Sequence, residues 1–194
     1  MEKLPRSLLF MAETLSHPAD TIPQESPPDQ YPILIRRLMW KTVITLHAKV
    51  VLEIGTCGGD SARIFSAALR ETGGHLYSLD HSGARGDWPE KWDCSNITFL
   101  VGNSLSYPWE KELDLLYIDG DHTYTTVLSD LTRFAPWVRP GGKILLHDTR
   151  LEGTDFSVRK AIFDWTGQHL LPWTEYPHVY GLGIIEIAER IPPS

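Results

Sequence analysis

Three acidic residues come at or near the end of short apolar runs in this sequence: Asp80, Asp119 and Asp148. Runs of this kind predict β-strands, and the carboxyl ends of parallel strands meet at one edge of a sheet. In sheet proteins that bind ribose, an acid at the tip of the second strand accepts hydrogen bonds from the sugar hydroxyls. Asp80 is the predicted ribose-binding residue. A solvated turn Asp before His81-Ser82-Gly83 is the alternative.

A glycine-containing loop precedes these acids. Residues 50–60 read VVLEIGTCGGD, in which an apolar strand leads into a turn with Gly55, Gly58 and Gly59, followed by apolar residues at helical spacing. Glycines let the backbone approach a ligand closely, and a helix N-terminus directs free N–H groups at it. The loop therefore predicts a site for a nucleotide-like small molecule. A turn that binds nothing is the alternative.

Two other nucleotide motifs are excluded. A dinucleotide G-x-G-x-x-G beginning at Gly55 would need glycine where Cys57 and Asp60 stand, and no G-x-x-x-x-G-K-[ST] occurs in the chain. A nicotinamide oxidoreductase is therefore disfavoured.

Strands and helices alternate along the chain. Apolar runs predict strands at 50–54, 75–79, 96–101, 114–118, 143–146, 173–176 and 183–188, and helical periodicity predicts helices at 33–48, 59–70, 124–134 and 156–168. Parallel strands need crossover helices. We therefore expect an α/β fold: a Rossmann-like, doubly wound sheet, mostly parallel with an antiparallel C-terminal strand, and helices on both faces.

The composition is that of an ordinary globular protein. The chain has 194 residues, 42% of them hydrophobic, and a net charge of −7. We expect an N-terminal arm over residues 1–30, with a short helix at Arg6 to Leu15, and one domain over residues 31–194. The acidic balance argues against nucleic acid or an anionic membrane as a partner. Two cysteines, no secretory core and no long apolar span favour a cytoplasmic protein.

The order of these parts, from about Ile33 to Ile187, resembles that of class I methyltransferases that use S-adenosylmethionine. Their first motif is similar to Glu53-x-Gly55-x-x-x-Gly59. The stretch 113–149, LDLLYIDGDHTYTTVLSDLTRFAPWVRPGGKILLHDT, is the most specific part. It resembles small-molecule O-methyltransferases of the catechol, caffeoyl-coenzyme A and macrolide-sugar kind.

The resemblance implies a divalent metal, commonly Mg²⁺, held by acids after the fourth and fifth strands. The matching residues are Asp119 and Asp148, with Thr149 as a further ligand. Carboxylates are ligands that Mg²⁺ prefers, and a metal-bound hydroxyl loses its proton more easily. Catechol-type enzymes have Asn where Thr149 stands, which makes this chain's third ligand weaker.

The resemblance also implies a catalytic base at His122. Catechol-type enzymes have Lys at this position, whereas the macrolide-sugar branch has a His that acts as general base. With an unperturbed pKa of about 6.5, His can accept a hydroxyl proton at neutral pH. The alternative is a structural residue in the first turn of a helix, with Asp121 as the N-cap.

The resemblance also implies a cofactor site, made of acids and turn residues at the tips of four strands. Asp80 would bind ribose, and Asn103 with Ser104 would lie near adenine. The sequence leaves the role of His147 open. The full set of expected cofactor-binding residues is Glu53, Gly55, Thr56, Gly59, Asp80, Asn103, Ser104 and Asp119.

The function implied is transfer of a methyl group from S-adenosylmethionine to a hydroxyl of a small molecule, with Mg²⁺ and His122 assisting. Two alternatives stay open: a metal-independent methyltransferase acting on nitrogen, a carboxylate or carbon, and a non-catalytic domain that binds S-adenosylmethionine or a protein partner. The sequence does not name the acceptor, and it leaves a homo-oligomer open.

Overall fold

A computed structural model describes residues 17–22, 32–82, 93–151, 153, 157–178 and 180–192. The helix expected at Arg6 to Leu15, most of the loop Gly83 to Cys94, and the expected helix start at Phe156 lie outside these residues. In the described part of the chain, no helix is both long and apolar enough to span a bilayer.

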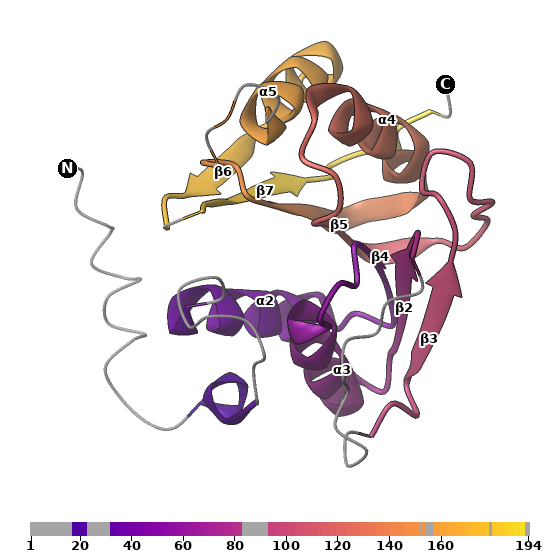
Figure 1. The fold of residues 1–194 in the computed structure, drawn as a ribbon, viewed down its shortest axis with the longest axis vertical. Coiled ribbons are helices and arrows are strands. Elements are labelled where there is room, and N and C mark those ends of the chain that lie inside the picture. Colours follow the sequence, from indigo (N-terminus) through magenta and orange to yellow (C-terminus); the bar gives the residue numbers. More distant parts are fainter. Residues whose placement is uncertain are drawn as a thin grey trace.

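The centre of the molecule is a seven-stranded sheet with the order β3-β2-β1-β4-β5-β7-β6 (Figure 1). Its neighbouring strands are parallel except that β7 runs antiparallel to both β5 and β6. The expected sheet with one reversed C-terminal strand is confirmed. The strands are β1 Val50–Ile54, β2 His75–Asp80, β3 Ile97–Val101, β4 Leu113–Ile118, β5 Val138–His147, β6 Trp173–Tyr176 and β7 Leu182–Glu186.

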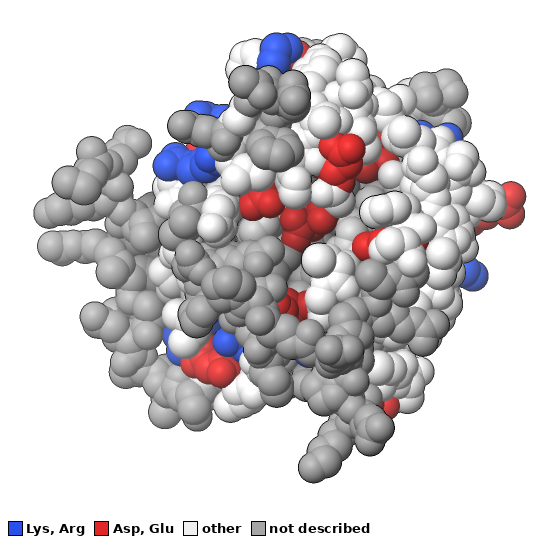
Figure 2. Space-filling model, in the orientation of Figure 1, with Lys and Arg blue, Asp and Glu red and all other residues white. Residues whose placement is uncertain are grey.

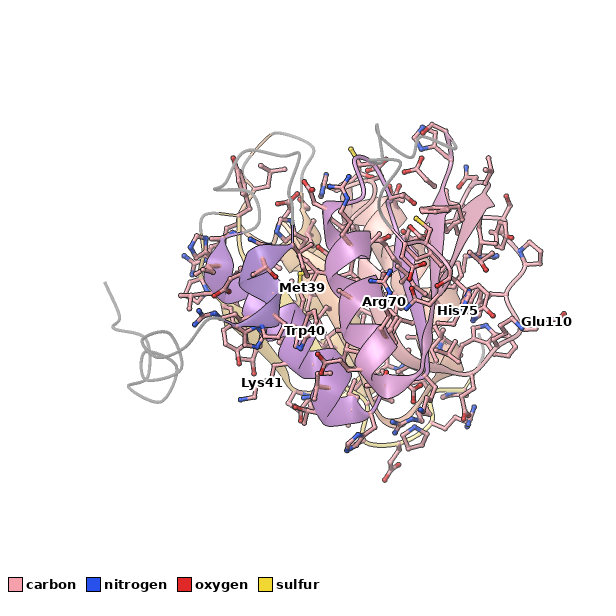
Figure 3. All side chains as sticks on the ribbon, turned by 90° about the horizontal axis from the view of Figure 1, so that it is seen from below. Met39, Trp40, Lys41, Arg70, His75 and Glu110 are labelled. Carbon is pink, nitrogen blue, oxygen red and sulfur yellow. The ribbon has the colours of Figure 1, made fainter. Side chains whose placement is uncertain are left out.

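Helices cover both faces of this sheet. α2 (Ile33–Leu46) and α3 (Asp60–Thr72) lie on one face, and α4 (Tyr124–Phe134) and α5 (Val158–His169) lie on the other (Figure 1). Figure 3 shows α2 and α3 side by side over their face. Strand side chains alternate between the two layers, so the core consists of two hydrophobic clusters with the sheet between them.

Part of the N-terminal arm packs against α2 through a short 3-10 helix, η1 (Pro18–Thr21). Ala19 is fully buried, and Asp20 forms an ion pair with Arg37 at 2.6 Å. The Arg36 guanidinium donates a hydrogen bond to the Ile22 carbonyl. Residues 17–22 therefore form part of the folded layer that covers this face.

The fifth strand begins earlier than expected. Residues 139–142 read as a turn before a strand at Lys143, but β5 already pairs with β4 at Val138. A register shift between Leu113 and Leu115 accommodates the extra residues, and Gly141 has a φ of 80°. Proline and glycine thus form an irregular section inside the strand instead of ending it.

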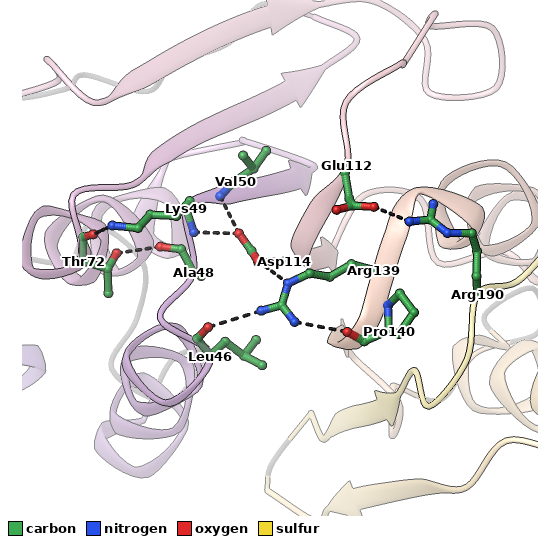
Figure 4. Close-up of polar contacts among 10 residues, drawn as sticks. All are labelled: Leu46, Ala48, Lys49, Val50, Thr72, Glu112, Asp114, Arg139, Pro140 and Arg190. Atoms are coloured by element: carbon green, nitrogen blue, oxygen red, sulfur yellow. Dashed lines mark hydrogen bonds and ion pairs between the residues drawn. The ribbon is translucent and has the colours of Figure 1, made fainter.

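A charged cluster ties the amino ends of β1, β4 and β5 together (Figure 4). Asp114 Oδ2 accepts hydrogen bonds from the backbone N–H groups of Lys49 (2.7 Å) and Val50 (2.9 Å). Asp114 Oδ1 accepts from Arg139 Nε at 2.5 Å, and Arg139 also donates to the Leu46 carbonyl. Burial raises the pKa of Asp114, but these donors outweigh it and the net shift is downward.

We expect Asp114→Asn to destabilise the fold by about 1.5–3 kcal/mol, because hydrogen bonds to a charged acceptor contribute about that much. Glu112→Gln is the matched control, since Glu112 forms an exposed ion pair with Arg190 nearby. That pair should contribute about 0–1 kcal/mol. Urea unfolding of both variants measures the difference. Equal losses would contradict the role given to Asp114.

Candidate functional site

The tips of β1 and β4 approach each other closely at Gly55. The Gly55 N–H donates to the Leu79 carbonyl (2.8 Å), and the Asp119 N–H donates to the Ile54 carbonyl (2.9 Å). Gly55 has a φ of 97°, and a Cβ there would collide with the backbone of Asp119 and Gly120. Only glycine fits this position without displacing the β4 tip.

A cavity of about 980 Å³ opens at the carboxyl edge of the sheet. This size suits a nucleoside-like ligand. Figure 2 shows acidic side chains gathered in the middle of this face, with Lys and Arg nearer its edges. The cavity brings together six of the expected site residues: Gly55, Asp80, Asn103, Ser104, Asp119 and His122.

Asp80 is held against the glycine loop. Its Oδ2 accepts from the backbone N–H groups of Thr56 (3.0 Å) and Cys57 (3.1 Å), and its Oδ1 accepts from Ser82 N (2.9 Å) and Oγ (2.7 Å). Burial raises the pKa of Asp80, yet these hydrogen bonds lower it overall. Asp80 is thus an ionised carboxylate at the β2 tip, able to accept hydroxyl donors from a ligand.

Glu53, Thr56 and Gly59 lie beneath or beside the loop and do not line the cavity. Glu53 is fully buried and accepts hydrogen bonds from Ser61 Oγ (2.5 Å) and from Ser78 Oγ. Burial raises its pKa to about 8. Thr56 Oγ1 lies 2.6 Å from Ser78 Oγ. These contacts support the loop from below, and direct cofactor binding by these three residues stays a prediction.

At the adenine end expected from the sequence, the β3 tip forms a compact turn. Asn103 Oδ1 accepts from the Leu105 N–H (2.9 Å). The Ser104 carbonyl accepts from Arg133 Nε (3.1 Å), which anchors the turn to α4. Both residues line the cavity.

Asp119, His122 and Asp148 converge beside the cavity. His122 Nε2 lies 2.8 Å from Asp148 Oδ2 and 3.6 Å from Asp119 Oδ1. One ligand atom from each of the three residues lies within 4.8 Å of the others, which is close enough to share a metal ion. Hydrogen bonds that His122 donates to Asp119 and Asp148 raise its pKa to about 9.

His122 lies in the loop before α4. The helix begins at Tyr124 with Thr123 as its N-cap, and Asp121 Oδ1 accepts from the Thr123 N–H at 2.7 Å. The alternative of a first-turn helix residue capped by Asp121 is therefore wrong. The loop conformation lets the imidazole reach back to the two carboxylates.

Thr149 faces away from this cluster toward the tail of the chain. Its hydroxyl donates to Glu175 Oε1 on β6 at 2.9 Å, and its side chain is buried. Glu175 also pairs with Arg150 at 3.2 Å and Arg159 at 3.6 Å. The role of Thr149 as a metal ligand stays a prediction.

Two further residues lie at this site: Tyr117, which was not identified from the sequence, and His147, whose role the sequence left open. Tyr117 donates its hydroxyl proton to Asp119 Oδ2 at 3.0 Å. His147 Nδ1 lies 3.0 Å from Asp148 Oδ1 and 3.4 Å from Asp119 Oδ1. Burial lowers the pKa of His147, but the two acids outweigh it and raise the pKa to about 10. Tyr117 sits in an apolar strand, where the sequence gives no sign of a polar role.

The sheet order and the reversed last strand define a Rossmann-like fold, and the cavity lies at the carboxyl edge, where sheets of this kind bind their ligands. Residues 52–149, just over half of the chain, match the model of a family described as a methyltransferase domain. The chain belongs to this methyltransferase-domain family. An uncharacterized protein of Sinorhizobium fredii is 31% identical over 88 residues, covering 43% of this chain but 10% of that relative's length.

Solved structures share the fold. Cofactor-bound Rv0187 from MTB superposes with a TM-score of 0.67 at 18% identity, covering 97% of this chain and 99% of that one. The O-methyltransferase from Bacillus cereus, in complex with SAH, gives 0.61 at 17% identity, covering 93% and 89%. The MycE methyltransferase of the mycinamycin pathway, in complex with Mg, SAH and mycinamycin VI, gives 0.53 at 20% identity, covering 75% and 48%. At these identities the likeness establishes the fold.

We expect Gly55→Ala to lower the stability of the protein and to abolish binding of S-adenosylhomocysteine. The added Cβ meets the Asp119 backbone, and alanine at a φ of 97° is strained by about 1–3 kcal/mol. Gly58→Ala is the control, because a Cβ there has no atom within 4 Å. Urea unfolding and calorimetric titration measure both effects. Wild-type behaviour of Gly55→Ala would contradict the close approach of the two tips.

The raised pKa of Glu53 predicts a pH-dependent stability. A carboxyl with a folded-state pKa of about 8 binds its proton more tightly in the folded protein than in the unfolded chain. The stabilisation is therefore fully present below the pKa of Glu in the unfolded chain, about 4.3. It is lost as the pH rises from that value toward the folded-state pKa of about 8. We expect Glu53→Gln to gain stability relative to wild type across this range, measured by urea unfolding at pH 5, 6.5 and 8. Parallel pH curves would count against a buried, protonated Glu53.

Proposed function

We propose that this chain transfers a methyl group from S-adenosylmethionine to a hydroxyl oxygen of a small molecule, with a divalent cation, Mg²⁺ by the chemistry of its ligands, and with His122 as the base. The observation that carries this proposal is the convergence of Asp119, His122 and Asp148 at the edge of the cavity that Asp80 and the glycine loop also form. One end of the cavity offers groups for a nucleoside, and the other offers groups for a reacting hydroxyl.

The family match and the residues at three strand tips support binding of S-adenosylmethionine. The chain matches a methyltransferase-domain family, and structures of the same fold contain S-adenosylhomocysteine. In this arrangement Asp80 would accept hydrogen bonds from the ribose hydroxyls, as expected for an acid at the β2 tip. Asn103 and Ser104 would border the adenine, and the backbone at Gly55 would lie against the amino-acid part.

The donor set fits a hard divalent cation. Asp119 Oδ1 and Asp148 Oδ2 are carboxylate oxygens that approach the same point near His122 Nε2, and both side chains are mostly buried. Carboxylates together with water or substrate oxygens satisfy the octahedral preference of Mg²⁺. When bound, the cation would hold the acceptor hydroxyl and lower its pKa. MycE, of the same fold, was crystallised with Mg.

His122 would take the hydroxyl proton at Nε2. As the carbon–oxygen bond forms, the carbon–sulfur bond of the sulfonium breaks and its electron pair stays on sulfur. Without a cation His122 holds its own proton, because its hydrogen bonds to Asp119 and Asp148, and their charges, raise its pKa to about 9. A cation shared by those carboxylates offsets their charge, so the base and the cation are expected to act together.

The buried surroundings suit this chemistry. Neighbouring carboxylates and imidazoles lie at fixed positions at the strand tips, so the acceptor would be oriented before transfer. The enzyme then contributes proximity and proton removal, which are what an in-line displacement at a methyl carbon requires.

We expect Asp148→Ala to reduce transfer from radiolabelled S-adenosylmethionine to catechol-type phenols by more than about 100-fold, while S-adenosylhomocysteine binds with nearly wild-type affinity. Asp148 does not line the cofactor cavity, so removing it should affect only the hydroxyl end. EDTA should have the same effect on the wild type. Asp164→Asn, which removes the partly exposed ion-pair partner of Lys160 on α5, is the control.

Three outcomes separate the alternatives. Turnover that survives EDTA and Asp148→Ala would indicate a metal-independent methyltransferase. Binding of S-adenosylhomocysteine without turnover on any acceptor would indicate a non-catalytic domain. No rise in melting temperature at millimolar S-adenosylhomocysteine would overturn the cofactor assignment, because a ligand at 100 times its Kd should add about 2.7 kcal/mol of stability.

A further inference from the structure

The two carboxylates of the proposed metal site each contact a buried side chain that does not line the cavity. We infer that Tyr117 and His147 are positioning residues that determine which oxygens of Asp119 and Asp148 face the cation. This inference rests on the proposed metal site, and it goes beyond it by assigning two residues that touch neither the cavity nor the reacting atoms.

Tyr117 holds one oxygen of Asp119. The tyrosine is fully buried on β4, with its ring packed edge-on against Phe65 at 5.1 Å between centroids. Its hydroxyl donates to Asp119 Oδ2 at 3.0 Å. The other oxygen, Oδ1, is the one that approaches His122. The hydrogen bond therefore assigns the two oxygens different roles.

His147 is the ion-pair partner of one oxygen of Asp148. The imidazole is 2% exposed, and its Nδ1 lies 3.0 Å from Asp148 Oδ1. Asp148 Oδ2 is the oxygen that lies 2.8 Å from His122 Nε2. His147 Nδ1 is also 3.4 Å from Asp119 Oδ1, so the ring sits between the two acids.

The register of the sheet explains why one ring reaches both acids. Tyr117 pairs with Leu145, and Ile118 pairs with Leu146. One step further along each strand, Asp119 stands beside His147. Side chains two residues apart share a face of a strand, so Tyr117 and Asp119 point the same way.

A left-handed turn then directs Asp148 back toward its neighbours. Asp148 has a φ of 58°, a conformation that non-glycine residues rarely adopt. Such backbone conformations persist where the surrounding contacts fix them. Here the contacts of Asp148 with His147 and His122 account for the retained conformation.

Fixed oxygens favour cation binding because the carboxylates need no reorientation when the ion arrives. Partners behind metal ligands typically contribute about 10–100-fold in metal affinity. A purely packing role for Tyr117 and His147 would instead lower stability without changing the affinity of the folded protein for the ion.

The test uses Mn²⁺ as the probe, with its binding to the full chain measured by electron paramagnetic resonance. Tyr117→Phe removes only the hydroxyl, and His147→Leu removes the donor from the ring position. We expect each to weaken Mn²⁺ binding by about 10–100-fold. Binding of S-adenosylhomocysteine, measured by calorimetry on the same samples, should stay within about threefold of wild type, a change below about 1 kcal/mol by the affinity relation.

A conservative variant separates positioning from packing. The amide nitrogen of Asn can occupy the place of His Nδ1, so His147→Asn should retain most of the Mn²⁺ affinity that His147→Leu loses. Tyr124→Phe is the matched control for Tyr117→Phe, because the Tyr124 hydroxyl bonds to Asp164, which lies on α5 away from the cluster. It should leave Mn²⁺ binding unchanged.

The outcomes distinguish this inference from the proposed function. Wild-type Mn²⁺ affinity in both Tyr117→Phe and His147→Leu would overturn the inference and leave the metal site intact. Equal loss of Mn²⁺ affinity in His147→Asn and His147→Leu would show that a donor at the Nδ1 position does not matter and would also overturn it. Loss of stability with unchanged Mn²⁺ affinity would indicate packing alone. Absence of Mn²⁺ binding in the wild type, with S-adenosylhomocysteine still bound, would overturn the metal site itself and the inference with it.

Discussion

The contact between the β1 and β4 tips is the constraint on which the site depends. Gly55 lets the backbone of the glycine loop pass directly against Asp119 and Gly120. That approach brings the loop that holds Asp80 next to the strand that presents Asp119. A side chain at position 55 would separate the end of the cavity near Asp80 from the end near Asp119. The parallel register of β1 with β2 and β4 extends this proximity along the edge of the sheet.

Much of this arrangement could be predicted from the sequence because it follows from periodicity and strand geometry. Apolar runs located the strands, and parallel strands necessarily bring Asp80, Asp119 and Asp148 to one edge.

What could not be predicted depends on backbone details that composition does not encode. Pro140 to Gly142 look like a turn but form an irregular part of β5, because β4 offers a partner at Leu113. His122 resembles a capped helix residue, yet the helix starts two residues later. Glu53 matches a cofactor motif, but it lies under the loop and bonds to two serines.

Charge is distributed in opposite ways at the two ends of the sheet. At the amino ends, Asp114 is paired with Arg139 and backbone donors, which stabilises three strands. At the carboxyl ends, Asp119 and Asp148 face each other and are partnered by histidines. Two negative charges at such a short separation destabilise each other unless a cation or a proton lies between them. At the carboxyl edge the partners of the acids are therefore histidines and a tyrosine hydroxyl, whereas at the amino ends they are an arginine and backbone N–H groups.

The hydrogen bond from Thr149 to Glu175 links the residue after Asp148 to β6, a strand that lies more than twenty residues further along the chain. Arg150 and Arg159 converge on the same Glu175 carboxylate. The hairpin of β6 and β7 thereby supports the carboxyl edge of the sheet, although none of its described residues lines the cavity. Removal of the chain from Trp173 onward would therefore take away the hydrogen-bond partner of Thr149, the residue next to Asp148.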